Sequence, residues 1–398
     1  MLEEEIFMDF EESPHIELNQ DGSTINLSNW YDPANRNWSY RHILDVMPHS
    51  ARVSRGEGPV HEFGSRPVDL SSVSISFRRR EMKLEEYLYE SHCDAFLVLQ
   101  GNDIVFEDYR RMEASERHLI QSTSKTGVCS LMGGLVAEGA IDLNATIDEY
   151  IPTVASGFKG VRVQDALDMN VALNFKEDFT KPDSDIYEYE IVSSMSNERA
   201  GMKASGLRSY LEKIEHDPNY DLDGVTNYLC PNTDVLGWLI EEVTGRSYVE
   251  LFQDKIYRHI GAEADAYFLT DSTGLAIACG GLVLRLRDLA RYAQIYANWG
   301  VANDGTQVIP ESWISECLDQ RRGTAFYMGD GSRYHNQMVN NGEALSHVGI
   351  AGQLMYANPT TKVVVVQFST TTMPSQGDMD FGNAIYNIGN AINDHLRS

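Results

Sequence analysis

The sequence lacks any long hydrophobic run: nowhere do about 18 apolar residues follow one another, the length that a membrane-spanning helix needs. It also lacks a secretory signal, because its first residues, MLEEEIFMDFEES, contain neither a basic segment nor an apolar stretch of the required length. We therefore expect a soluble protein that is not exported and that has no membrane partner.

Cysteines are few, and their spacing predicts no cross-link. The chain has five, an odd number, and none of them forms a C-x-x-C pair. A disulfide framework and a zinc knuckle are both disfavoured, so we expect reduced thiols in a cytoplasm and no metal. The five are Cys93, Cys129, Cys230, Cys279 and Cys317.

Basic residues are scarce relative to acidic ones. Lys and Arg total 32 against 59 Asp and Glu, which leaves a formal net charge of −27. A chain this acidic repels phosphate backbones and anionic lipid headgroups, so we expect a small-molecule partner and no nucleic acid. With 398 residues, of which 42% are hydrophobic, the chain can form roughly two or three domains around a large core.

Several widespread catalytic and nucleotide-binding motifs are also absent. The sequence contains no G-x-S-x-G, no H-E-x-x-H, no P-loop, and no G-x-G-x-x-G between a strand and a helix. The enzyme classes that depend on those motifs are therefore disfavoured, and we expect no cofactor.

The distribution of apolar residues predicts an acidic arm and two domains. Residues 1–29 are the arm, because the first 21 contain eight acidic residues and no Lys or Arg. Residues 30–120 and 276–398 are expected to form an α/β domain, whose first part, up to about residue 80, is an extension wrapped over it. Residues 121–275, rich in loops and short helical stretches, are expected to form a mostly helical domain.

Two β-hairpins, one in each half of the chain, predict an antiparallel sheet assembled from both halves. Each consists of two apolar or alternating runs joined by turn residues. Helices are predicted where apolar residues recur at helical spacing, and Asp288 is expected to cap or start one of them. The hairpins join 95–100 to 104–109 and 353–357 to 363–368, and the helices span 122–138, 233–243, 289–299 and 385–396.

An S-x-x-K tetrad, from Ser122 to Lys125, opens the first of these helices. A spacing of three puts both side chains on one helical face, so the amine can reach the hydroxyl. A lysine can activate a serine as a nucleophile only when burial or nearby positive charge lowers the pKa of the amine. The N–H groups at a helix start also favour a developing oxyanion. The alternative is that Ser122 is an N-cap and Lys125 a solvated residue.

Two other segments contain residues that suit the same chemistry. Tyr228 lies four residues before Asn232, near the start of the helix 233–243, and could instead be an aromatic residue that packs on that helix. His347 and Gly349 lie in a glycine-spaced segment that leads into a strand, where backbone can approach a ligand closely. His347 could equally be an ordinary histidine.

Together these segments resemble the serine β-lactamase and penicillin-binding-protein superfamily, and in particular its class C-like esterases and its 6-aminohexanoate-dimer hydrolase group. The resemblance covers roughly residues 30–395. It implies a β-lactamase/DD-peptidase-like fold of the α/β plus all-α class, with an antiparallel sheet flanked by helices and an inserted helical domain.

The resemblance also implies a covalent mechanism. Ser122 Oγ would attack a carbonyl carbon, Lys125 and Tyr228 would share the role of general base, and water would hydrolyse the acyl-enzyme. The backbone N–H groups of Ser122 and Ile350 would form the oxyanion hole. The expected enzyme is a serine hydrolase, a carboxylesterase or amidase that acts on a small ester or linear amide. An acyltransferase that uses the same acyl-enzyme and a catalytically silent binding protein are the alternatives.

Three positions depart from the family pattern and bear on the substrate. Cys230 stands where the superfamily often has Asn or Ser, and Phe179 where the 6-aminohexanoate-dimer hydrolases carry Tyr. The segment from His347 to Gly349 stands in the place of the K-T-G or H-x-G strand, so the Lys that helps to bind a β-lactam carboxylate is absent. We expect substrate contacts at Cys230, Phe179, His347 and Gly349. We also expect esters to react faster than amides or β-lactams. Oligomeric state is left open, with a homodimer as one option.

Overall fold

The main feature of the computed structural model is a nine-stranded sheet with the order β10-β11-β12-β13-β14-β15-β5-β6-β2. Neighbouring strands are antiparallel, except that β2 runs parallel to β6. The strands are β2 (Gly64–Ser65), β5 (Cys93–Gln100), β6 (Asp103–Tyr109), β10 (Thr324–Ala325), β11 (Arg333–His335), β12 (Met338–Asn340), β13 (Leu345–Gly349), β14 (Gln353–Asn358) and β15 (Val363–Ser369). The structure describes residues 24–77, 80–179, 181, 183–199, 201–326, 330–371 and 379–398, so the predicted acidic arm lies, up to residue 23, outside the described residues.

The sheet joins distant parts of the sequence in the way that the two hairpins predict. β5 and β6 form the first predicted hairpin, and β14 and β15 form the second. β15 then pairs with β5, so that Val363 lies opposite Gln100. Both hairpin predictions are confirmed. The strands β10, β11 and β12 were not predicted, because two or three residues are too few to show an alternating pattern.

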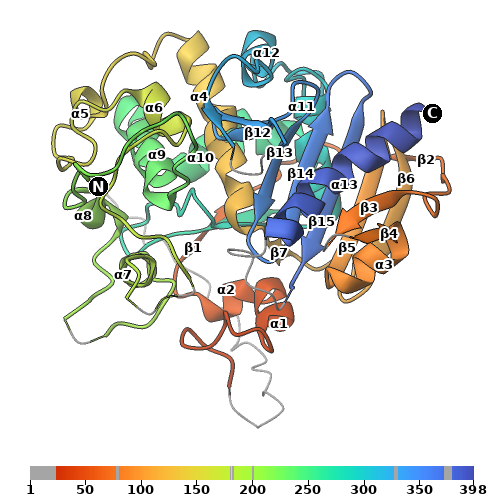
Figure 1. The fold of residues 1–398 in the computed structure, drawn as a ribbon, viewed down its shortest axis with the longest axis horizontal. Helices are drawn as coiled ribbons and strands as arrows, with labels where there is room; N and C mark the ends of the chain where they lie inside the picture. Colours follow the sequence, from red (N-terminus) through yellow and green to blue (C-terminus); the bar gives the residue numbers. More distant parts are fainter. Residues whose placement is uncertain are drawn as a thin grey trace, which may run out of the picture.

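The central strands are buried on both faces, because helices cover both (Figure 1). Val364 of β15 belongs to the core that contains α11 (Leu286–Ala297), whereas Val363 belongs to the core that contains α13 (Met379–Arg397). Side chains alternate along a strand, so the unbroken run of valines in β15 supplies both cores. The predicted C-terminal helix is confirmed, and its buried apolar face includes Ile385, Ile388 and Ile392.

A second sheet, with the order β1-β8-β9-β7, was not predicted. Its first strand comes from the N-terminal extension, and its last strand, β7, ends shortly before the S-x-x-K tetrad. The extension therefore builds part of the fold rather than only wrapping over it, while the domain boundaries at residues 120 and 276 stay a prediction. The strands of this second sheet are β1 (Ser50–Val53), β7 (His118–Leu119), β8 (Ala266–Leu269) and β9 (Leu282–Leu284). The first part of the chain also contains α1 (Arg36–Arg41), α2 (Ile43–Val46), β3 (Ser74–Phe77), β4 (Arg80–Lys83) and α3 (Leu84–Glu90).

The region between the two halves of the large sheet is mainly helical. The helix predicted over 233–243 is α9, which has Pro231 in its first turn and ends at Gly245, whose φ of 64° is the left-handed conformation that caps helices. That helix prediction is confirmed. The helices are η1 (Gln121–Lys125), α4 (Thr126–Ala137), α5 (Ile147–Tyr150), α6 (Val163–Leu167), α7 (Ile186–Val192), α8 (Leu207–Leu211), α9 (Cys230–Thr244), α10 (Tyr248–Lys255) and η2 (Tyr257–His259), and α12 (Glu311–Cys317) follows α11.

The helix predicted over 289–299 is α11, but its start differs from the expectation. The helix begins at Leu286, so the prediction that Asp288 caps or starts it is wrong. Asp288 is buried in the first turn, where its carboxylate accepts the backbone N–H of Glu263 and pairs with Arg291. Its partners include a loop more than twenty residues earlier in the chain, which helical spacing cannot reveal.

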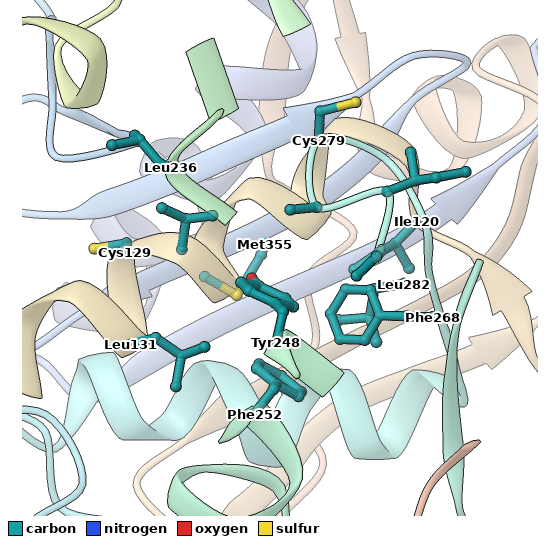
Figure 2. Packing of buried hydrophobic residues seen from close by; sticks show 14 of the residues in the cluster. Ile120, Cys129, Leu131, Leu236, Tyr248, Phe252, Phe268, Cys279, Leu282 and Met355 are labelled. Atoms are coloured by element: carbon teal, nitrogen blue, oxygen red, sulfur yellow. The ribbon is translucent and has the colours of Figure 1, made fainter. Parts of the chain in front are cut away.

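The helix α4, which follows the tetrad, is buried on nearly every side. Figure 2 shows Cys129 and Leu131 of α4 in the same apolar cluster as Tyr248 and Phe252 of α10. Gly127 permits this close packing, since a Cβ there would lie 2.5 Å from the hydroxyl oxygen of Tyr248. The predicted buried helix is confirmed, although its first turn, η1, is a 3-10 helix. Among the described residues, no helix is both long enough and apolar enough to traverse a bilayer.

Candidate active site

The candidate nucleophile Ser122 lies in η1, the tight turn between β7 and α4. Its side chain is half-buried and lines a cavity, and Lys125 Nζ donates a hydrogen bond to its Oγ over 3.2 Å. Lys125 is fully buried, so it is not the solvated residue of the alternative interpretation. Ser122 is not the N-cap residue of either η1 or α4. The spacing of the tetrad therefore brings the amine to the hydroxyl.

The ammonium group of Lys125 is held by groups from distant segments. It donates to the backbone carbonyl of Cys279 over 2.8 Å and to Cys230 Sγ over 3.4 Å, and it lies 4.9 Å from the centre of the Tyr228 ring. Burial lowers the pKa of Lys125, but neighbouring acidic groups, led by Cys230 and Cys279, raise it above its usual value. The lowered pKa expected of an amine base is therefore absent.

His347 lies on β13 behind Tyr228 and does not line the cavity. It is fully buried, and its Nε2 lies 3.4 Å from Tyr334 Oη. The ring of Tyr334 packs edge-on against the ring of Tyr228, with 5.7 Å between centroids. Burial, together with the charge of Lys125, lowers the pKa of His347 to about 3, so the imidazole is neutral at pH 7. The structure thus places His347 in the packing behind Tyr228. The substrate contact expected of His347 is not formed by a residue that lines the cavity, and the alternative of a packed histidine agrees with this position.

Gly349 and Ile350, at the end of β13, line the same cavity as Ser122. A Cβ on Gly349 would collide with the carbonyl oxygen of Ile120, so a glycine is needed for the strand to approach the turn this closely. Thr123 Oγ1 donates a hydrogen bond to the carbonyl of His347 over 3.5 Å, which also links the turn to β13. Ser122 and Ile350, the two residues expected to form an oxyanion hole, therefore line the same cavity.

The cavity has a volume of about 150 Å³ and is mostly apolar. Aromatic side chains line it, among them Trp30 and Tyr31 from the N-terminal extension and Phe179 from the loop before α7. The rings of Tyr31 and Phe179 lie 6.0 Å apart. None of the lining residues in the described part of the chain is Lys or Arg. Sequence analysis identified Phe179 but not the two aromatic residues of the extension, because that segment has no clear period.

Glu177 is a functional candidate that sequence analysis missed. It lines the cavity, and its carboxylate accepts the backbone N–H of Cys230 over 2.6 Å and the thiol of Cys230 over 3.1 Å. Burial raises the pKa of Glu177, against the opposing effect of Lys125. Cys230, expected to weaken a polar contact, is thus hydrogen-bonded to both Glu177 and Lys125. The one available signal was that Glu177 lies two residues before Phe179 on the loop already singled out.

Glu190, on α7, is a second carboxylate at the cavity. Burial raises its pKa to about 7, although the charge of Arg199 acts in the opposite direction. No sequence pattern distinguishes Glu190 from the other acidic residues of this chain. Within the described residues, no group of three or more His, Cys, Asp or Glu side chains is arranged to hold a metal ion.

A mainly antiparallel sheet covered by helices, joined to a helical region whose buried helix starts with an S-x-x-K turn, defines a β-lactamase and penicillin-binding-protein-like fold. The chain belongs to the Beta-lactamase family of hydrolases, whose family model matches residues 83–385. The superfamily and the fold class expected from the sequence are both confirmed.

Comparison with individual proteins agrees with this assignment. A 6-aminohexanoate-dimer hydrolase from Paenarthrobacter ureafaciens is 30% identical over 359 residues, which cover 87% of this chain and 88% of the relative. A solved structure from Bacillus anthracis, provisionally named a 6-aminohexanoate-dimer hydrolase, is 26% identical with a TM-score of 0.84 and covers 96% of this chain and 99% of its own. A penicillin-binding-protein homologue from Caulobacter crescentus is 14% identical with a TM-score of 0.55, over 74% of this chain and 92% of its own, a likeness of fold alone.

Proposed function

We propose that this protein is a serine hydrolase that cleaves a small ester or linear amide through an acyl-enzyme on Ser122. The observation that carries the proposal is the buried ammonium of Lys125, 3.2 Å from Ser122 Oγ beside a mostly apolar cavity. A lysine is seldom buried without a role, because its desolvation is costly. Here the ammonium is directed at a hydroxyl that faces the cavity.

The proposed reaction starts with attack of Ser122 Oγ on the substrate carbonyl carbon. In this step Tyr228 acts as the phenolate, its charge balanced by the ammonium of Lys125, and takes the proton of Ser122, while the negative charge on the carbonyl oxygen is stabilised by the N–H groups of Ser122 and Ile350. Tyr228 returns the proton to the leaving group as the carbon–oxygen or carbon–nitrogen bond breaks. Water then attacks the acyl-enzyme, releases the acid and restores Ser122.

The raised pKa of Lys125 assigns it an electrostatic part in this scheme. A lysine that keeps its proton stabilises the negative charge that develops on Ser122 Oγ and on the Tyr228 oxygen. Proton transfer to and from the substrate then falls mainly to Tyr228. The neutral imidazole of His347 supports the packing of the Tyr228 ring and adds no competing charge.

The charge of the cavity supports a neutral or cationic substrate. Its walls contain the carboxyl groups of Glu177 and Glu190, and no Lys or Arg among the described lining residues. No lining Lys or Arg among the described residues is therefore available to pair with an anionic group on a substrate, which disfavours β-lactams that carry a carboxylate. The dimer in the name of the Paenarthrobacter ureafaciens relative is a linear amide with an amine at one end and a carboxylate at the other, so only its amine end suits the walls of this cavity.

A labelling experiment tests the proposal. The wild-type protein should take up one fluorophosphonate per chain, as measured by intact-protein mass spectrometry, and should hydrolyse p-nitrophenyl butyrate. Ser122→Ala should abolish both, whereas the control Ser193→Ala, which alters another serine of the same cavity, should retain them. Stoichiometric label in Ser122→Ala would show that another residue is the nucleophile. Label without turnover of any ester or amide would instead support the silent binding protein.

A further inference from the structure

The residue before the proposed nucleophile has an unusual backbone conformation. Gln121 is buried and has a φ of 51°, in the left-handed region. Glycine enters that region easily, whereas the Cβ of other L-residues crowds a backbone carbonyl oxygen. Contacts from elsewhere in the fold must therefore hold Gln121 in this conformation.

One such contact comes from the N-terminal extension. Gln121 Nε2 donates a hydrogen bond to Tyr40 Oη over 2.9 Å, and both side chains are buried. Tyr40 lies on α1, and its ring packs edge-on against His118 with 5.4 Å between centroids. Tyr40 also lies outside residues 83–385, the part that matches the family model. The contact therefore joins the extension to the matched region, which contains Gln121.

The strand β13 encloses the same turn on another side. A Cβ on Gly349 would lie 3.0 Å from Gln121 Cβ, so the backbone of β13 touches the turn. Gln121 is thus held between β13 and the hydroxyl of Tyr40, and it cannot relax to an ordinary φ without moving one of these groups.

The conformation of Gln121 determines where the Ser122 N–H points. One peptide plane contains both this N–H and the carbonyl group of Gln121, so it rotates with the backbone dihedral angles of Gln121. Ser122 is the second residue of η1, and the first N–H groups of a helix have no acceptor within it. The helix itself therefore leaves this N–H for an external acceptor, which in the proposed reaction is the oxyanion.

We propose that Tyr40 is a positioning residue: through Gln121 it holds the left-handed turn that directs the N–H and Oγ of Ser122 at the substrate carbonyl. The inference rests on the proposed function of Ser122. Tyr40 does not line the cavity, and its ring, which Tyr40→Phe keeps, leaves the cavity-lining Tyr31 in place although a hydrogen bond between the two tyrosines is lost. Loss of the hydroxyl should therefore act on the rate of acylation more than on substrate binding.

The variant Tyr40→Phe removes only the hydroxyl and keeps the ring. We expect kcat to fall about 10-fold, KM to stay within about twofold, and the rate of fluorophosphonate labelling to fall by the same factor as kcat. The control Tyr257→Phe removes another buried hydroxyl, which donates to the carbonyl of Ala264, and should leave kcat unchanged. A wild-type kcat in Tyr40→Phe overturns the proposal.

Substitution of Gln121 separates control of the turn from general packing. Gln121→Gly adopts a positive φ without an anchor, so it should retain more activity than Gln121→Ala. Adding Tyr40→Phe to Gln121→Gly should then change kcat by less than about twofold, because the coupled partner is gone. A full 10-fold loss in that background overturns the proposal, since Tyr40 would act by another route.

Ser122→Ala, measured beside these variants, distinguishes the two hypotheses. Turnover that survives in Ser122→Ala removes the proposed function and the inference that rests on it. Turnover that is lost in Ser122→Ala but is undiminished in Tyr40→Phe removes only the positioning role of Tyr40.

Discussion

Lys125 contacts both of the other proposed catalytic residues: its amine is 3.2 Å from Ser122 Oγ and 4.9 Å from the centre of the Tyr228 ring. We expect Lys125→Ala and Tyr228→Phe each to lower kcat by about 10²- to 10⁴-fold. The double variant should lose little more than the worse single variant, because groups that act as a unit are not additive. Steady-state kinetics on a p-nitrophenyl ester measures these effects.

A double variant that loses the product of the two single factors would contradict a shared role. Lys125→Arg provides the matched control for charge. It keeps a cation near Ser122, but its larger planar group does not fit the hydrogen bonds that Lys125 makes to Ser122 Oγ and to the carbonyl of Cys279. We therefore expect Lys125→Arg to be nearly as inactive as Lys125→Ala.

Glu190 makes the affinity for a cationic substrate depend on pH. Burial raises its pKa to about 7, so the carboxyl is mostly neutral at pH 6 and mostly ionised at pH 8. KM for p-nitrophenyl 6-aminohexanoate, whose aliphatic amine stays protonated over this range, should therefore fall about 3- to 10-fold between these values. KM for the uncharged p-nitrophenyl hexanoate should stay constant, and Glu190→Gln should remove the difference. Equal pH profiles for the two esters on the wild type would show that Glu190 does not face the amine.

At the scale of elements, the end of β13 must press against the turn that carries Ser122. Gly349→Ala introduces a Cβ that collides with the carbonyl oxygen of Ile120, so the strand or the turn must move. We expect kcat to fall on the order of 10²-fold, because the N–H of Ile350 moves with the strand, and stability to fall by about 1–3 kcal/mol. Kinetics and urea unfolding measure the two effects.

Gly134, on α4, provides the matched control for that substitution. A Cβ at Gly134 meets no atom within 4 Å, and alanine is the better helix former. Gly134→Ala should therefore leave kcat unchanged and raise stability by about 0.5–1 kcal/mol. Wild-type kinetics in Gly349→Ala would mean that β13 takes no part in stabilising the oxyanion.

For the whole molecule, we expect p-nitrophenyl butyrate to be hydrolysed with a higher kcat/KM than a linear amide or a cephalosporin. An amide nitrogen leaves only with a positioned proton and an orienting hydrogen bond, whereas a phenoxide leaves with less help. Phe179 has no hydroxyl to give such a hydrogen bond, and no Lys or Arg among the described lining residues pairs with a cephalosporin carboxylate. An amide or cephalosporin that reacts as fast as the ester would contradict this substrate argument, and the assignment of Ser122 would be unaffected.

Features that depend on spacing within one segment could be predicted from the sequence. The spacing of the S-x-x-K tetrad places Ser122 and Lys125 on one face, and the 3-10 helix that contains them, with about three residues per turn, keeps them there. Apolar runs joined by turn residues predict the hairpin of β5 and β6. Helical spacing of apolar residues predicts the buried helix α4 and the apolar face of α13. In each case, the apolar residues that the local pattern predicts to face the core are buried or partly buried in the structure.

The tertiary structure alone decided the features that depend on residues far apart in the chain. Glu177 and Glu190 reach the cavity, His347 lies behind Tyr228, and Tyr40 bonds Gln121 across 81 positions. The upward direction of the Lys125 pKa also depends on Cys230 and Cys279, which lie more than a hundred residues later. The sequence by itself determines the longer helices and strands, such as β5, α4 and α13, because periodicity and turn chemistry are local. Only folding brings distant charges and hydroxyls within a few ångströms, and the electrostatics of the site depend on those distances.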